Sequence, residues 1–80
     1  MFSMKLTLSY VGYLKLDGVK NGETVEVPDG STAIDVMTRF GIPTHHQRHV
    51  TVFVNEEERR GHIELEDGDD LTLVIQVGGG

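Results

Sequence analysis

Apolar and polar residues alternate along three segments of the chain, residues 4–11, 23–27 and 71–77. A period of two is that of a β-strand with one buried face, so each segment predicts a half-buried strand. Residues 50–54, VTVFV, are rich in β-branched side chains and predict a further strand. A short extended piece is expected at residues 63–65, before the turn that leads to the last strand.

One segment, residues 33–40, has helical spacing instead. Its apolar positions recur every three or four residues: Ala33, Ile34, Val36, Met37 and Phe40. Ser31 or Thr32 is expected to cap the first turn, because a short side-chain oxygen accepts hydrogen bonds from the free amides there. Gly41 ends the predicted helix and Pro43 prevents its resumption.

Turn signals separate these elements. Residues 17–18 (Asp-Gly) and 21–22 (Asn-Gly) lie between the first two strands, and we favour the Asn-Gly pair as the hairpin turn. A polar loop is expected after the helix, and the charged segment 55–61 is expected to be a turn with a solvated tip at residues 56–60. The order strand, strand, helix, strand, short strand, strand predicts an α+β fold in which a mixed sheet of four to five strands packs on one main helix.

The composition limits the classes of protein this chain can be. Its 80 residues are enough for one small domain, which we place at residues 1–77, followed by a flexible glycine tail at residues 78–80. The absence of cysteine excludes disulfides, thiolate metal sites and cysteine nucleophiles. A net charge of −6 argues against nucleic-acid binding. We expect a cytoplasmic protein, because no signal peptide and no apolar run long enough for a bilayer is present.

The polar clusters predict neither a metal centre nor a catalytic site. His45, His46 and His49 could supply imidazoles to a metal, but they lie in the predicted polar loop and we interpret them as solvated. The aspartates within residues 67–70 lack the ligand spacing of an EF-hand and predict an Asp-rich turn. No Ser/His/Asp arrangement rises above chance, and no glycine-rich phosphate loop precedes a helix. The chain is therefore not expected to be an enzyme.

The last three residues, Gly78, Gly79 and Gly80, are all glycine. At the average glycine frequency, three such residues at the terminus arise by chance on the order of 3 times in 10,000. Glycine has no Cβ, so this tail can enter a narrow channel and present its carboxylate unshielded. Extended, the steps from Gln76 to Gly80 reach about 13–14 Å. The alternatives are a frayed end or an engineered scar.

Two apolar side chains, Phe53 and Val74, face away from the main apolar set of their strands, and Gln76 lies on the same side as Val74. If that side of the sheet is open, Phe53 and Val74 form a modest apolar patch for a partner. The other interpretation is a secondary cluster beneath a loop. The acidic surface likewise suits either docking on a basic partner or solubility alone.

Five short motifs occur in an order that resembles the ThiS/MoaD-type sulfur-carrier proteins, which are ubiquitin-like β-grasp domains. They are residues 27–32 (VPDGST), 41–43 (GIP), 54–55 (VN), 65–69 (LEDGD) and 77–80 (VGGG). The resemblance extends from Met4 to Gly80. A long first connection favours the molybdopterin-type carriers and the VGGG ending favours the thiamin-type carriers, so the branch stays open.

The resemblance implies a role for the C-terminus and a set of partners. A ubiquitin-activating-type adenylyltransferase would adenylate the carboxylate of Gly80, and a persulfide from a sulfur donor such as a cysteine desulfurase would convert it to a thiocarboxylate. An acceptor synthase would then take the sulfur for thiamin or for molybdopterin or tungstopterin. On this hypothesis the chain is a cosubstrate without a cofactor, and Phe53, Val74 and residues 76–79 bind the partners. The alternatives are a ubiquitin-like modifier joined to lysines, and a plain β-grasp binding module.

Overall fold

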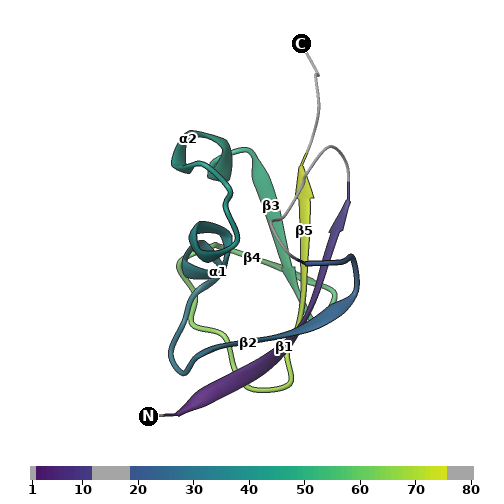
Figure 1. The fold of residues 1–80 in the computed structure, drawn as a ribbon. Coiled ribbons are helices and arrows are strands. Elements are labelled where there is room, and N and C mark those ends of the chain that lie inside the picture. Colours follow the sequence, from purple (N-terminus) through teal and green to yellow (C-terminus); the bar gives the residue numbers. More distant parts are fainter. Residues whose placement is uncertain (1, 12–18, 76–80) are drawn as a thin grey trace.

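The computed structural model describes residues 2–11 and 19–75 of the chain. Five strands and two helices follow one another in these residues: β1 (Ser3–Val11), β2 (Glu23–Pro28), α1 (Ala33–Arg39), α2 (Thr44–Gln47), β3 (Val50–Val54), β4 (Glu57–Arg59) and β5 (Asp70–Ile75). The strands form one sheet in the order β2-β1-β5-β3-β4 (Figure 1). The predicted α+β class and the mixed sheet are therefore confirmed.

The first and the last strand lie side by side in the middle of the sheet. β1 and β5 are parallel, with Tyr10 opposite Leu73 and Val11 opposite Val74. The remaining pairs, β1 with β2, β3 with β4 and β3 with β5, are antiparallel. Because β1 and β5 run in the same direction, their C-terminal ends meet at the same edge of the sheet.

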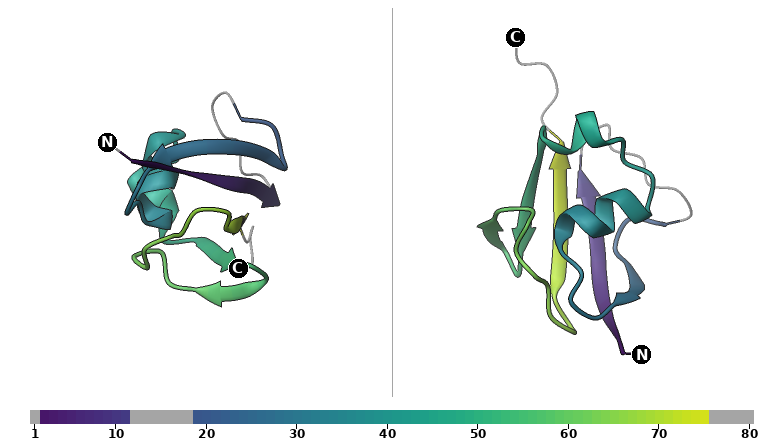
Figure 2. Two further views of the ribbon diagram at one scale, coloured as in Figure 1. Left: turned by 90° about the horizontal axis from the view of Figure 1, so that it is seen from below. Right: turned by 90° about the vertical axis from the view of Figure 1, so that its left-hand side faces the viewer.

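One face of the sheet carries the hydrophobic core. The inward side chains of β1 (Met4, Leu6, Leu8) and of β5 (Leu71, Leu73) are at most 1% exposed, as the alternation predicts. Both helices lie on this face, as the right-hand view of Figure 2 shows. α1 adds three buried side chains to the core: Ala33, Val36 and Met37.

Local hydrogen bonds fix both ends of α1. The Thr32 hydroxyl accepts from the Asp35 amide (3.2 Å) while the Asp35 carboxylate accepts from the Thr32 amide (3.0 Å), which is a capping box. At the other end, Gly41 has a φ of 92° and its amide donates to the Thr38 carbonyl. The Ile42 amide donates to the Met37 carbonyl (2.9 Å), which completes a Schellman motif.

Removal of the capping hydroxyl gives a first prediction. Thr32→Ala is expected to lower the free energy of unfolding by about 1 kcal/mol, because the Asp35 amide loses its acceptor. Thr32→Ser keeps the hydroxyl and should lose much less. Urea denaturation of the three proteins measures the difference, and equal stabilities of Thr32→Ala and the parent chain would contradict this account of the cap.

One member of the predicted apolar stripe, Ile34, lies outside the core, with 41% of its surface exposed. Its side chain lies against Gly61, and its amide donates to the Gly61 carbonyl (3.0 Å), so Ile34 faces the segment after β4 and not the middle of the sheet. α1 has seven residues and buries one face against the sheet. Ile34 lies outside that face.

The prediction of a plain polar loop after α1 is wrong, because residues 44–47 form α2. Gly41 ends α1 as predicted, but Pro43 does not prevent a new helical turn. Its φ of −59° suits the start of one, and the amides of His46 and Gln47 donate to its carbonyl. The Gln47 side-chain amide donates to the Ile42 carbonyl (2.9 Å) and to the Thr38 hydroxyl (3.0 Å), which ties α2 to the end of α1.

The charged segment 55–61 is also more ordered than a turn. It contains β4, which pairs with β3 through a tight turn at Asn55 and Glu56, both at positive φ. The short strand is therefore at residues 57–59 and not at residues 63–65, where the structure has a bend and an isolated bridge between Glu64 and Thr32. All three side chains of β4 are exposed, so no apolar alternation marks this strand.

Asn21 and Gly22 do form a turn, but it is not the tight turn that was predicted to join the two strands, because β1 ends at Val11 and β2 starts at Glu23. The Glu23 amide donates to the Lys20 carbonyl (3.0 Å) and Gly22 has a φ of 85°. This turn ends the connection between β1 and β2 and leads directly into β2. The alternative Asp-Gly pair lies outside the described residues, as do the last two positions of the predicted strand 71–77.

Candidate functional site at the end of the central strand

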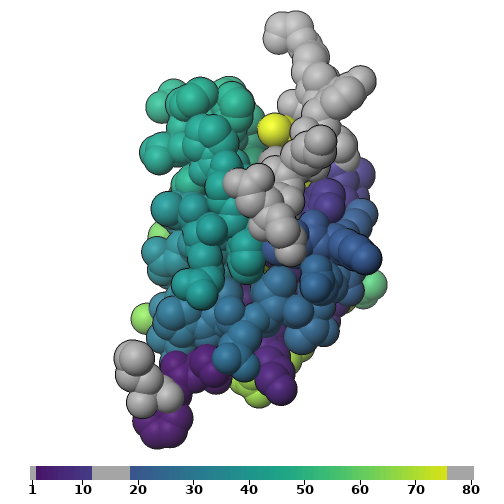
Figure 3. All heavy atoms as spheres, viewed as in Figure 1, coloured from purple at the N-terminus to yellow at the C-terminus, as the bar shows by residue number. Residues whose placement is uncertain are grey.

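The predicted functional tail starts at the middle of the sheet. Residues 76–80 (Gln76, Val77, Gly78, Gly79 and Gly80) lie outside the described residues, and their attachment point, Ile75, is the last residue of β5. Ile75 is paired with Val50 at the start of β3, and β1 runs along the other side of β5. The end of β5 reaches the surface beside α2 in the space-filling view (Figure 3). The tail is therefore attached to a strand that is paired with β1 on one side and with β3 on the other.

The face of the sheet opposite the helices carries the predicted docking residues. In the register of the sheet, Val74 lies between Val11 on β1 and Thr51 on β3, and Phe53 lies next to Thr72. Val11 is 54% exposed, and Phe53 and Val74 are half-buried. We call Val11, Phe53 and Val74 the outer-face patch.

Among the described residues, Phe53 and Val74 are separate from the core. Neither residue belongs to the core cluster or packs against it. Within residues 2–11 and 19–75 both helices lie on the other face (Figure 2). Val11 was missed as a site residue, although it is the one apolar residue on the polar side of the first alternating segment, after Lys5, Thr7 and Ser9.

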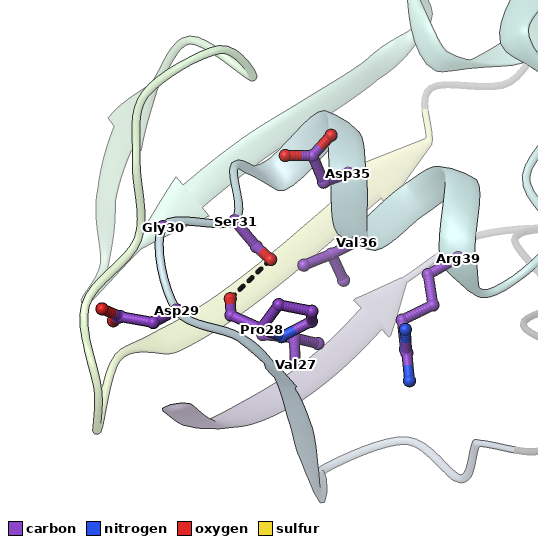
Figure 4. Close-up of a pocket in the computed structure, with 8 residues that line it drawn as sticks. All are labelled: Val27, Pro28, Asp29, Gly30, Ser31, Asp35, Val36 and Arg39. Carbon is purple, nitrogen blue, oxygen red and sulfur yellow. Dashed lines mark hydrogen bonds between the residues drawn. The ribbon is translucent and has the colours of Figure 1, made fainter. Parts of the chain in front are cut away.

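A separate pocket of about 370 Å³ lies between the end of β2 and α1 (Figure 4). Its polar groups already serve the fold: the Ser31 hydroxyl donates to the Pro28 carbonyl (2.6 Å), and Asp35 belongs to the capping box. Pro28 pairs with Ser3 at the start of β1, so this pocket is at the end of the sheet away from Ile75. It supplies no group to the tail.

The histidines are exposed, as expected, but two of them are in a helix. His45 and His46 lie in α2 with ring centroids 4.2 Å apart, and His49 directly precedes β3. Across the described ranges, no three His, Asp or Glu side chains are arranged to hold a metal ion. The Asp-rich turn is structural: Asp67 accepts from the Lys5 amide (2.7 Å) and Asp69 from the Glu66 amide (2.8 Å).

The fold defines the class of protein. A mixed sheet with its first and last strands parallel in the centre and one main helix across a face is a ubiquitin-like β-grasp. The chain is similar over its whole length to SAMP1 from Haloferax volcanii, whose crystal structure matches with a TM-score of 0.55 at 26% sequence identity, over 99% of this chain and 100% of that one. No protein-family profile matches the chain, and no curated protein matches its sequence significantly.

The described helices are too short to cross a membrane. In the part of the chain that the structure describes, α1 has seven residues, and no helix is long and apolar enough to cross a bilayer.

Proposed function

We propose that the chain is a sulfur carrier whose functional group is the carboxylate of Gly80. The observation that supports this most is the position of β5, a central strand that ends at Ile75 and leads directly into residues 76–80, QVGGG. The whole-length similarity to SAMP1 supports a ubiquitin-like role, and hence an activating enzyme of the ubiquitin-activating type as the first partner.

The proposed chemistry takes place at the carboxyl group of Gly80. An oxygen of the Gly80 carboxylate attacks the α-phosphorus of ATP and pyrophosphate leaves, which gives an acyl-adenylate. The terminal sulfur of a partner's persulfide then attacks the acyl carbon and AMP leaves. A thiol of a partner then attacks the sulfur that still belongs to the partner, which breaks the acyl disulfide, releases the thiocarboxylate on Gly80 and leaves a disulfide on the partner side. The chain contains no cysteine, so every thiol in this sequence of steps belongs to a partner.

The globular body would hold the activating enzyme while the tail enters its active site. Ordering the tail costs about 1–2 kcal/mol per residue, so contacts made by the body have to offset this cost. The outer-face patch is suited to that contact, since Val74 lies on β5 itself, close to the start of the tail. A partner docked on this patch is within about 20 Å of Gly80 along an extended chain.

The patch gives a second prediction. The double variant Phe53→Ser/Val74→Ser is expected to raise the KM for the carrier about tenfold with kcat unchanged, because the patch contributes binding and no chemistry. Ile63→Ser is the matched control, since Ile63 is 41% exposed and lies outside the patch. Steady-state adenylation assays measure both constants. An unchanged KM in a folded double variant would remove the patch from the docking surface.

The first step of the proposed reaction can be tested with purified proteins. The chain should stimulate exchange of labelled pyrophosphate into ATP by the ubiquitin-activating-type enzyme of the same organism. An enzyme that is active with another carrier and gives no exchange with this chain would contradict the proposal.

Conjugation to proteins is the second candidate, because a lysine amine can attack the same acyl-adenylate-derived carbonyl. A modifier would use the same fold and the same glycine tail as the sulfur carrier. Recovery of lysine-linked conjugates from cells, joined through Gly80, would favour the modifier. A plain binding module would instead bind its partner equally well after removal of residues 78–80.

A further inference from the structure

A second groove lies on the helix side of the sheet, between the helices and the β3–β4 edge. Its volume is about 610 Å³. Four apolar residues line it: Met37 and Val52, at 2% and 3% exposure, the half-buried Val50 and the exposed Ile34. The groove thus has an accessible apolar centre.

The rim of the groove is basic although the chain is acidic. The chain has 13 acidic and 7 basic residues, yet three arginines (Arg48, Arg59 and Arg60) and only one acidic residue, Glu58, line the groove. Arg59 is paired with Glu57 at 3.2 Å. Arg48 and Arg60 form no ion pair with any described residue. Two exposed positive charges at this groove are therefore available to an anionic ligand.

A stretch of strand edge borders the same groove. β4 pairs with β3 only from Val52 to Val54, so Val50 and Thr51 have no strand partner on that side among the described residues. An extended peptide can add to such an edge through main-chain hydrogen bonds. The groove therefore combines a free edge, an apolar centre and a basic rim.

We propose that this groove binds an extended acidic peptide segment of a partner protein. An aliphatic side chain of the peptide packs between Ile34 and Val50, its backbone lies along Val50 and Thr51, and its carboxylates face Arg48 and Arg60. The free strand edge favours a peptide over a small anion, because only a peptide can use all three features. The interaction involves no residue of the tail, so it stands independently of the proposed sulfur chemistry.

A defined peptide tests the proposal. The probe is acetyl-Glu-Asp-Leu-Val-Leu-Asp-Glu-amide, titrated into the full-length ¹⁵N-labelled chain. Saturable shifts of the Val50, Thr51 and Arg60 amides are expected, and a control peptide with Gln and Asn in place of Glu and Asp should bind at least about tenfold more weakly. Absence of saturation at millimolar peptide, or shifts centred on β2 or on the outer-face patch, would overturn the proposal. Equal competition by inorganic phosphate or by a short oligothymidylate would do the same, since it would indicate a general anion surface.

Matched charge variants locate the contact. Arg48→Glu/Arg60→Glu is expected to weaken peptide binding at least about tenfold. Lys20→Glu/Arg39→Glu changes the net charge equally at exposed positions outside the groove and should change the affinity less than about twofold. Equal losses in the two double variants would refute a local site. If the groove double variant does not fold, the single variants Arg48→Gln and Arg60→Gln replace it, and unchanged affinity in both would refute the proposal.

Discussion

Deletion of Gly80 is expected to lower ATP-dependent activation at least about 100-fold, because misplacing a reacting group by about 1 Å can already cost that factor. One residue fewer withdraws the terminal carboxylate by about 3.3–3.6 Å from a body whose docking position is fixed. Addition of one alanine after Gly80 should have a similar effect. The carboxyl group of Gly80 is then part of a peptide bond and has no free oxygen to attack ATP. Pyrophosphate exchange measures both variants.

The same variants should fold as the parent chain does. β5 ends at Ile75, and the core side chains Leu71 and Leu73 precede the tail. Changes at residues 78–80 are therefore expected to alter the free energy of unfolding by less than about 0.5 kcal/mol. Retained activation in either variant, at undiminished stability, would contradict the assignment of the terminus as the functional group.

Leu73→Ala has the largest expected effect on stability. Leu73 is fully buried on the central strand, between Tyr10 of β1 and Val52 of β3. Truncation of such a side chain costs about 2–5 kcal/mol through lost burial and the cavity that remains. A domain of this length has only about 4–12 kcal/mol in total, so a substantial unfolded fraction is expected.

Val74→Ala is the matched control for Leu73→Ala. It lies next to Leu73 on the same strand and points to the opposite face, where it is half-buried and outside the core cluster. Its loss should be about 1 kcal/mol or less. Urea denaturation compares the two, and equal losses would mean that Val74 belongs to a second core and not to a docking patch.

The strands that bury one face could be predicted from the sequence, and the elements without a buried face could not. Residues 50–54 were predicted with the bounds of β3, because β-branched side chains fill that segment. β4 lies at the sheet edge with every side chain exposed, and its turn at Asn55 and Glu56 contains no glycine. α2 buries no side chain, so its four residues have no apolar stripe.

The sequence could predict on which face of the sheet single site residues lie. It could not predict which residues from other strands lie next to them. Alternation alone placed Phe53 and Val74 on the outer face. Their neighbour Val11 comes from the other end of the chain and joins them only because β1 and β5 are parallel. The basic groove has the same origin, since Arg48 follows α2 and Arg60 follows β4, and both line the groove at the β3–β4 edge. Contacts between residues that are far apart in the sequence cannot be seen in the apolar–polar pattern of a short segment.

The most direct test of the central claim is the mass of the C-terminal peptide after reaction. The full-length chain is incubated with its activating enzyme, ATP and a persulfide donor, and the terminal fragment is then sequenced by mass spectrometry. The account predicts exchange of one oxygen for sulfur at Gly80, absent without ATP and absent from the variant with an added alanine. An unmodified Gly80 under conditions in which the enzyme converts another carrier, or sulfur found at any other residue, would contradict it.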